Sequence, residues 1–388
     1  MRLAHFSVFN DGCHSPVDAY FDSKLNGEIM RKVATKCYLP TNQILLEALE
    51  KNPDFRISFS TTGVFLEQAE MFAPDVIESF RALAKTGRVE FLSETYYHSL
   101  SSLFAEKDEF IEQISLHKLK LHQLGLTNGG KHGVFRNTEA MFSNEIAYLA
   151  ERLGYSGIMA EGFDTTLGWR SPTYLYGVKT TSKIKAMLRH YKLSDDIGYR
   201  FSARWWNEYP LTADKYAKWL SRLSGDCCNL FMDYETFGEH HWEDTGIFSF
   251  LRALPGEISK HPHLQFTTPS ELATSTQSNG EIDVPQITSW ADMERDTSAW
   301  LGNDMQRACW AELTSLEKPI KELDEPEYLR AWRHLQNSDH LYYCCTKSLS
   351  DQDVHNYFSP YDSPFDSFIN YMNVLQDMKM RVNERLKK

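Results

Sequence analysis

Short apolar runs alternate with longer segments of helical periodicity along the first 280 residues of the chain. The apolar runs predict strands at 56–60, 89–92, 133–136, 157–160 and 264–266, and the three-to-four residue spacing predicts helices at 29–51, 74–86, 107–124, 144–153, 247–254 and 269–274. We place Ser270 near the start of the last helix, as a cap. Strands that alternate with helices are typical of a parallel sheet, so the pattern predicts an α/β fold.

Acidic residues follow two of the apolar runs directly. The run 229–232 ends at Asp233 and is followed by four more carboxylates up to Asp244, and the strand at 133–136 is followed by Glu139. The carboxyl ends of barrel strands are where α/β barrels assemble their active sites, so these acids favour a barrel over an open sheet. A solvated acidic loop is the plain alternative for the segment 233–244 taken alone. Two acids on two strand ends are the pair that glycoside cleavage requires.

Four ordered blocks carry a family resemblance. The blocks are Phe-Arg-Asn-Thr-Glu at 135–139, Met-Asp-Tyr-Glu-Thr-Phe-Gly-Glu-His at 232–240, Val-Glu-Phe-Leu-Ser-Glu-Thr-Tyr-Tyr-His-Ser-Leu at 89–100, and Ser-Trp-Ala-Asp-Met-Glu-Arg-Asp leading to Trp-Leu-Gly-Asn at 289–303. Together they resemble glycoside hydrolase family 57, a family of retaining α-amylases and 4-α-glucanotransferases. The resemblance implies a distorted seven-stranded (β/α) barrel, with Glu139 as the nucleophile and Asp233 as the general acid/base.

The beginning of the chain departs from the family pattern. The family opens with a barrel strand that carries a His-Gln-Pro motif, followed within a residue or two by Arg-Leu, whereas this chain begins Met1-Arg2-Leu3. We therefore expect the first strand to be missing from this chain, which would leave unpaired backbone groups on its neighbours. A natural short form in which 4–9 takes that position is the alternative. Without the motif, the chain could also be inactive or a non-catalytic glucan-binding relative.

The pattern changes at two further places. Between 163 and 228, Trp169, Trp205 and Trp206 lie among polar residues, which predicts long loops over the barrel mouth that either pack on its wall or stack on sugars. After 285 only helical periodicity is seen, at 298–318, 326–338 and 364–384. We expect a catalytic barrel over 1–284, with the insertion at 163–228, and a helical domain over 285–388 that completes the cleft.

Several residues near the two acids are candidates for substrate binding. Glu235 lies two residues past Asp233 and points to the same side of an extended segment, so it is also the rival for the acid role. Arg136 could keep the nucleophile charged or form a salt bridge at a strand end. The remaining candidates follow from the resemblance: His98 as a hydrogen-bond donor to a sugar hydroxyl, Glu94 as a sugar contact or a residue behind one, and Trp290, Asp292 and Trp300 as parts of the cleft wall, with Trp290 the preferred stacking residue.

Composition narrows the functional class. The net charge of −12 and the lack of a Lys/Arg cluster argue against nucleic acid, and no apolar run is long enough for a membrane span. The 7 cysteines show no CxxC spacing, and the adjacent histidines 240 and 241 have no HExxH spacing, so we expect no disulfide framework, metal or cofactor. The expected location is the cytoplasm and the expected partner an α-1,4-glucan. The sequence leaves hydrolysis and glucanotransfer both open.

Overall fold

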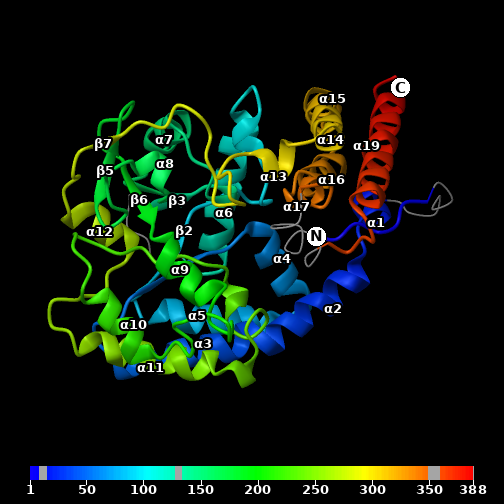
Figure 1. The fold of residues 1–388 in the computed structure, drawn as a ribbon. Helices are drawn as coiled ribbons and strands as arrows, with labels where there is room; N and C mark the ends of the chain where they lie inside the picture. The colour runs from blue at the N-terminus through cyan, green and yellow to red at the C-terminus, as the bar shows by residue number, and fades with distance from the viewer. Residues whose placement is uncertain (8–14, 127–132, 348–358, 388) are drawn as a thin grey trace.

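The structure, a computed structural model, describes residues 1–7, 15–126, 133–347 and 359–387. Its strands lie in one half of the molecule and are surrounded by helices, while a group of helices from the last quarter of the chain stands at the other side (Figure 1). The strands are β1 (Ile57–Ser60), β2 (Val89–Leu92), β3 (Val134–Arg136), β4 (Gly157–Glu161), β5 (Leu175–Val178), β6 (Lys185–Arg189) and β7 (Glu281–Ile282).

The sheet is mostly parallel. β1 pairs with β2, and β3, β4 and β6 follow one another in parallel, with β5 antiparallel to β6 and β7 parallel to β5. Single parallel bridges, Ser93 with Phe135 and Arg189 with Asn229, extend the wall at both ends of the β3–β4–β6 group. The expected strand at 229–232 is therefore only an extended segment with one bridge. The structure shows an α/β fold, in which the strands of the described residues form a pair and a five-stranded sheet; the seven-stranded barrel stays a prediction.

Helices cover these strands at the expected places, but the first expected helix begins earlier, at Ser23, and an additional helix lies at Gly63–Phe72. They are α2 (Ser23–Val33), a π-helical turn (Ala34–Tyr38), α3 (Leu39–Lys51), α4 (Gly63–Phe72), α5 (Pro74–Lys85), α6 (Asp108–Gln123), α7 (Asn144–Arg152), α11 (Ile247–Ser259) and α12 (Pro269–Ser275). The strand expected at 264–266 is absent, because this segment makes no ladder bonds before α12 begins. Thr268 and Glu271 form the capping box of α12, whereas Ser270 donates its backbone N–H to Glu90 at 2.9 Å.

The insertion at 163–228 is more ordered than the loops that we expected. It contains β5, β6, α8 (Asp164–Leu167), α9 (Tyr191–Gly198) and α10 (Ala213–Leu220). β6 lies between β4 and β5, and its Ala186, Met187 and Leu188 are fully buried. The apolar part of β6 is only three residues long and lies between Lys185 and Arg189, so periodicity alone does not distinguish it from a loop.

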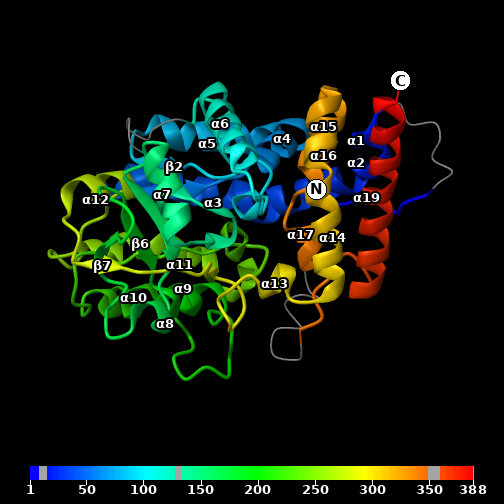
Figure 2. The same cartoon turned by 90° about the horizontal axis from the view of Figure 1, so that it is seen from above.

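The helices near the C-terminus pack around their own apolar core. They are α13 (Ser298–Leu301), α14 (Asp304–Ser315), α15 (Glu317–Leu323), α16 (Pro326–Leu335), α17 (Asp339–Tyr342) and α19 (Pro364–Leu386), in Figure 2 yellow to red. The expected helix 298–318 is interrupted because Asn303 caps α14 in a capping box with Gln306. The core also takes in Leu3, Tyr20 and Phe21, so the N-terminal segment and α1 (Pro16–Tyr20) join this group.

The described N-terminal residues lie beside helices. The backbone N–H of Ala4 donates to the Tyr20 carbonyl at 2.8 Å, and that of Phe6 donates to Asn370 Oδ1 of α19 at 2.8 Å. Residues 4–7 therefore do not occupy a position next to β1, and residues 8 and 9 lie outside the described part of the chain. In the described residues, no helix combines the length and apolar character that a membrane crossing requires.

Candidate active site

Glu139 is held in a strained turn at the end of β3. Its φ is 56° and that of Ala140 is 50°, so two successive residues with a Cβ adopt the left-handed region. Such conformations cost about 1–3 kcal/mol each and persist where surrounding contacts enforce them, often in active sites. Two contacts do so here: the backbone N–H of Trp290 donates to the Glu139 carbonyl at 3.1 Å, and Asn137 Nδ2 donates to the Met141 carbonyl at 3.2 Å.

Three side chains contact the Glu139 carboxylate. His98 Nε2 lies 2.8 Å from Oε1, Trp290 Nε1 donates to Oε2 at 2.7 Å, and Ser338 Oγ donates to Oε1 at 3.4 Å. Burial alone would raise the pKa of Glu139, but the hydrogen bond and charge of His98, the charge of Arg136 and the Trp290 hydrogen bond together lower it to about 2. Glu139 is therefore ionised at neutral pH.

His98 reaches Glu139 from the loop after β2. Its φ is 52°, and its carbonyl accepts a hydrogen bond from the backbone N–H of Ser338 at 2.9 Å. Burial would lower the pKa of His98, but the hydrogen bond and charge of Glu139 outweigh it, so the pKa is raised. The structure thus places His98 against the Glu139 carboxylate. Its expected contact with a sugar hydroxyl stays a prediction.

The pKa of Asp233 is shifted in the opposite direction from that of Glu139. Asp233 follows the extended segment 229–232 and is exposed to solvent as a residue, although neighbouring protein groups desolvate its carboxyl group. This burial, together with the negative charges of Glu235 and Glu139, outweighs the charges of His240 and Arg136 and raises the pKa of Asp233 to about 6. The separation of about 5–5.5 Å between the two carboxyl groups, expected of a retaining enzyme, stays a prediction.

Arg136 and Glu94 form a buried pair behind the nucleophile. Arg136 Nη1 donates to Glu94 Oε2 at 3.3 Å, and Glu94 is only 1% exposed. Arg136 thus forms an ion pair, and its charge also helps to lower the pKa of Glu139, while its support of a nucleophile stays a prediction. Glu94 is the residue behind the site rather than a sugar contact, because its carboxylate is engaged and inaccessible.

Trp290 is surrounded by protein groups. The guanidinium carbons of Arg136 and Arg189 lie 4.9 and 5.6 Å from the centroid of its ring, and the Phe231 ring lies 5.6 Å away. Its indole N–H is committed to Glu139. This packing suits a residue that orients the nucleophile better than one that offers a free ring face to a sugar.

Replacing Trp290 by Phe should therefore raise the pKa of Glu139, because the substitution removes a donor to the charged carboxylate and keeps an aromatic ring. In the unaltered protein unfolding should end activity before Glu139 takes up a proton, so we expect an acid limb from Glu139 to enter the pH–rate profile only in the variant, with the alkaline limb unchanged. Steady-state kinetics on maltooligosaccharides between pH 3 and pH 8 would show this. A rise in KM without a new acid limb would instead indicate that Trp290 acts mainly as a sugar-stacking residue.

Asp292 and Trp300, the other two residues of the expected cleft wall, have different surroundings. Asp292 has a φ of 54° and accepts a hydrogen bond from Lys347 Nζ at 2.7 Å, and its charge acts on the nearby Tyr342. Trp300 is 1% exposed and packs in the core of the C-terminal helices. Its expected place in the cleft wall is therefore wrong: an apolar ring on the first turn of α13 is buried by the neighbouring helices.

Residues that we did not single out from the sequence also reach the site. Ser338 contacts Glu139 from the junction of α16 and α17, and Tyr342 of α17 has a pKa raised by burial and by the charges of Asp292 and Glu139. Tyr199, after α9, has a pKa raised to about 12 by burial and by the charge of Asp233. Tyr199 lies in the aromatic-rich segment, the one sequence signal that could have pointed to it.

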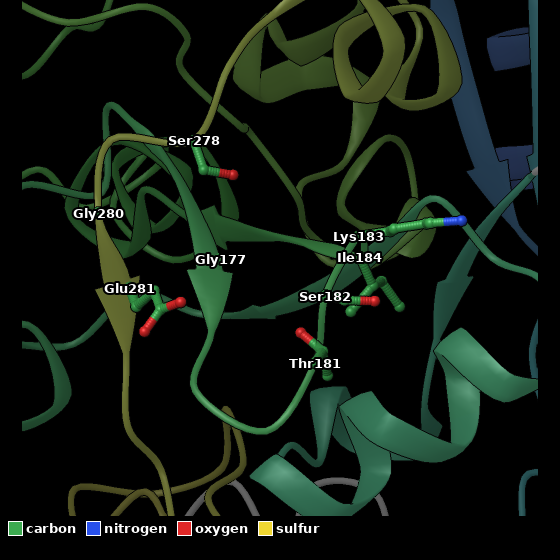
Figure 3. Close-up of a pocket in the computed structure, with 8 residues that line it drawn as sticks. All are labelled: Gly177, Thr181, Ser182, Lys183, Ile184, Ser278, Gly280 and Glu281. Carbon is green, nitrogen blue, oxygen red and sulfur yellow. The ribbon is translucent and has the colours of Figure 1, made fainter.

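Two pockets lie apart from these acids. One of about 290 Å³ is lined by residues of the β5–β6 turn and of the segment before β7, and Figure 3 shows the side chains of Thr181, Ser182 and Glu281 around it. The other, of about 360 Å³, is lined by Tyr209, Phe250 and neighbours in α10 and α11.

No group of three or more His, Cys, Asp or Glu side chains suited to a metal ion occurs within the described ranges.

Comparisons with known proteins place this geometry in a family. Residues 13–285 match the model of glycosyl hydrolase family 57. A Methanocaldococcus jannaschii protein named "Putative alpha-amylase" is 50% identical over 96% of this chain and 80% of its own length, and a Pyrococcus furiosus α-amylase is 24% identical over 74% of this chain and 41% of its own length.

Solved structures share the fold. A GH57 branching enzyme from Thermococcus kodakaraensis aligns over 95% of this chain and 87% of its own, with a TM-score of 0.67 and 14% identity. A 4-α-glucanotransferase from Thermococcus litoralis aligns over 81% of this chain and 51% of its own, with a TM-score of 0.60 and 18% identity. The family match spans more than half of the chain and includes both strand-end acids. The chain belongs to glycosyl hydrolase family 57.

Proposed function

We propose that this protein is a retaining glycoside hydrolase that acts on α-1,4-glucans, with Glu139 as nucleophile and Asp233 as general acid/base. The observation that carries the proposal is the opposite tuning of the two carboxyl groups: the pKa of Glu139 is lowered to about 2, and that of Asp233 is raised to about 6. Between these values one group is ionised while the other holds a proton, which is the division of labour that double displacement needs.

The chemistry follows from these protonation states. The Glu139 carboxylate attacks the anomeric carbon while Asp233 transfers its proton to the leaving glycosidic oxygen, so the C–O bond breaks and a glycosyl ester forms on Glu139. Asp233, now ionised, takes a proton from an incoming hydroxyl as that oxygen attacks the anomeric carbon, so the bond between this carbon and Glu139 breaks and the carboxylate is restored. His98 and Trp290 hold the carboxylate in position through both steps.

The parallel order from β1 through β2, β3, β4 and β6 to Asn229 supports a barrel-like wall, and we include the seven-stranded barrel and the division at 284/285 in the proposal.

The cysteines in the described residues are all free, which supports a reducing compartment such as the cytoplasm.

Transfer to another glucan is the second candidate. The specific observation in its favour is that fold relatives include a 4-α-glucanotransferase and a branching enzyme. The two activities share the glycosyl ester and differ only in whether water or a sugar hydroxyl attacks it. Product analysis of maltoheptaose digests distinguishes them, because transfer produces chains longer than the substrate whereas hydrolysis releases one reducing end per cleavage. Binding of the glucan with neither product would support a non-catalytic relative.

Product stereochemistry tests the proposal. Proton NMR during early turnover of maltooligosaccharides should show the α-anomer before mutarotation, because two inversions restore the original configuration. A first product in the β form would contradict a glycosyl ester on Glu139.

The pH dependence should be set by the same pair. Because Asp233 must be protonated to act as an acid, kcat/KM should fall as the pH rises through about 6. On the acid side, Glu139 keeps its charge down to about pH 2, so unfolding should end activity before protonation of the nucleophile does. A profile that stays flat from pH 5 to pH 9 would argue against Asp233 as the proton donor.

A further inference from the structure

The helical segment that packs against the loop after Asp233 contains a π-helical turn. α2 and α3 are joined through the π-helical turn Ala34–Tyr38, and this turn packs against the 3-10 turn Tyr234–Thr236 that follows Asp233. π-helical turns are rare and are frequent at functional sites, because the extra residue changes which side chains face the neighbouring element. Here Cys37 and Tyr38 are both buried.

The π-helical turn and the start of α3 hold the loop at several points. Cys37 Sγ lies 3.2 Å from the Tyr234 carbonyl, and Thr41 Oγ1 donates to the Phe237 carbonyl at 3.1 Å. Gly238 has a φ of 112°, and a Cβ there would lie 2.0 Å from the carbonyl oxygen of Lys36, so only glycine allows this approach. The loop that carries the acid is therefore seated on a rigid element.

Tyr38 makes the contact closest to the chemistry. Its hydroxyl donates to Glu235 Oε1, while its ring stacks on Tyr234, with centroids 6.2 Å apart, and meets the edge of Phe65 at 5.1 Å. Burial and the charge of Glu235 raise the pKa of Tyr38 well above its usual value, so the phenol remains a donor. Glu235, the rival for the acid role, is thus a carboxylate already engaged by a fixed donor.

Glu235 in turn acts on Asp233. After burial, its negative charge is the largest influence that raises the pKa of Asp233, ahead of that of Glu139 after β3, whereas the charges of His240 in the same loop and of Arg136 in β3 lower it. Tyr199, after α9, also lies within the electrostatic reach of Asp233. A carboxylate held at a fixed position favours the protonated form of its neighbour, because two negative charges repel each other.

We propose that Tyr38 and Glu235 form a positioning pair: the Tyr38 hydroxyl holds the Glu235 carboxylate in the turn that follows Asp233, so that its negative charge acts on Asp233 from a fixed position. The role of Asp233 as the proton donor rests on the proposed function, but the coupling among the three residues does not.

NMR titration tests the coupling without any assay of activity. Protein labelled with ¹³C at the aspartate carboxyl group, with the Asp233 signal assigned by its absence in D233N, reports the pKa of Asp233 directly. In E235Q this pKa should fall by about one pH unit, because the neighbouring negative charge is removed. In Y38F, which keeps the ring, the pKa should fall by less, and the double variant Y38F/E235Q should fall no further than E235Q.

Tyr234→Phe is the matched control. Tyr234 donates its hydroxyl to Asn42 Oδ1 across the same pair of segments and does not contact Glu235 through that group. Its substitution should leave the pKa of Asp233 in place. A shift in Y234F equal to that in Y38F, or additive shifts in Y38F/E235Q, would overturn the pairing of Tyr38 with Glu235, and an unchanged pKa in E235Q would overturn the proposal as a whole.

Kinetics give the second readout. In E235Q the alkaline limb of kcat/KM should move down by the same amount as the pKa, so activity at pH 7 should fall about tenfold while activity near pH 4.5 stays close to that of the unaltered protein. A uniform loss at every pH would overturn the tuning role of Glu235 and indicate a contact with substrate. Absence of glucan cleavage by the unaltered protein would count against the proposed function and leave the NMR result standing.

Discussion

Replacement of Glu139 by Gln should reduce turnover of maltooligosaccharides by about 10⁴-fold or more, because the amide cannot form the glycosyl ester and removal of a nucleophile has effects of this size. The fold should remain, since Gln keeps the shape of the side chain: its oxygen can accept from Trp290 Nε1, and its NH2 group can donate to Nε2 of a neutral His98. Initial rates with reducing-sugar detection, alongside thermal melting, would measure both effects.

Glu145→Gln is the matched control for this change. Glu145 is exposed on α7, and Lys107, at 3.6 Å, is its ion-pair partner, so its loss should be silent. Glu139→Ala provides a positive signature, because azide can enter the space that the carboxylate leaves and attack an activated α-glucoside directly. The product should be the β-glycosyl azide. Near-normal rates in E139Q would remove Glu139 from the mechanism.

Asp233→Asn should lower kcat on glucans by about 10²–10⁴-fold, the usual contribution of a general acid. The loss should be much smaller for the first step with α-maltosyl fluoride, because fluoride departs without a proton. The alkaline limb near pH 6 should also disappear, since it belongs to the Asp233 carboxyl group.

Asp244→Asn, an exposed position in the same segment, should leave all three properties unchanged. An equal loss on glucan and on the fluoride would show that Asp233 supports the fold or binds sugar rather than donating a proton. If E235Q instead of D233N showed the leaving-group dependence, Glu235 would be the acid and the positions of the two carboxylates in the mechanism would be exchanged.

The two acids were predictable from the sequence because their signal is local. An apolar run that ends at a carboxylate needs no distant partner to be recognised, and the same holds for the helices around the sheet and near the C-terminus, whose periodicity is contained within each segment. Two wrong expectations about strands also arise because the pattern is read locally. β6 was missed because its apolar part is three residues long, and a strand was expected at 264–266 although ladder formation depends on a neighbour that the local pattern does not contain.

Tertiary structure alone decided how the two acids differ. The contacts that lower the pKa of Glu139 join it to His98, 41 positions away, and to Trp290, 151 positions away, and Tyr38 meets Glu235 across 197 positions. The burial of Glu94 next to Arg136 likewise depends on residues that are distant in the sequence. The same holds for the burial of Trp300 in the core of the C-terminal helices. A sequence pattern shows which groups can ionise, but a pKa depends on desolvation and on neighbouring charges, and both arise only when distant segments are brought together.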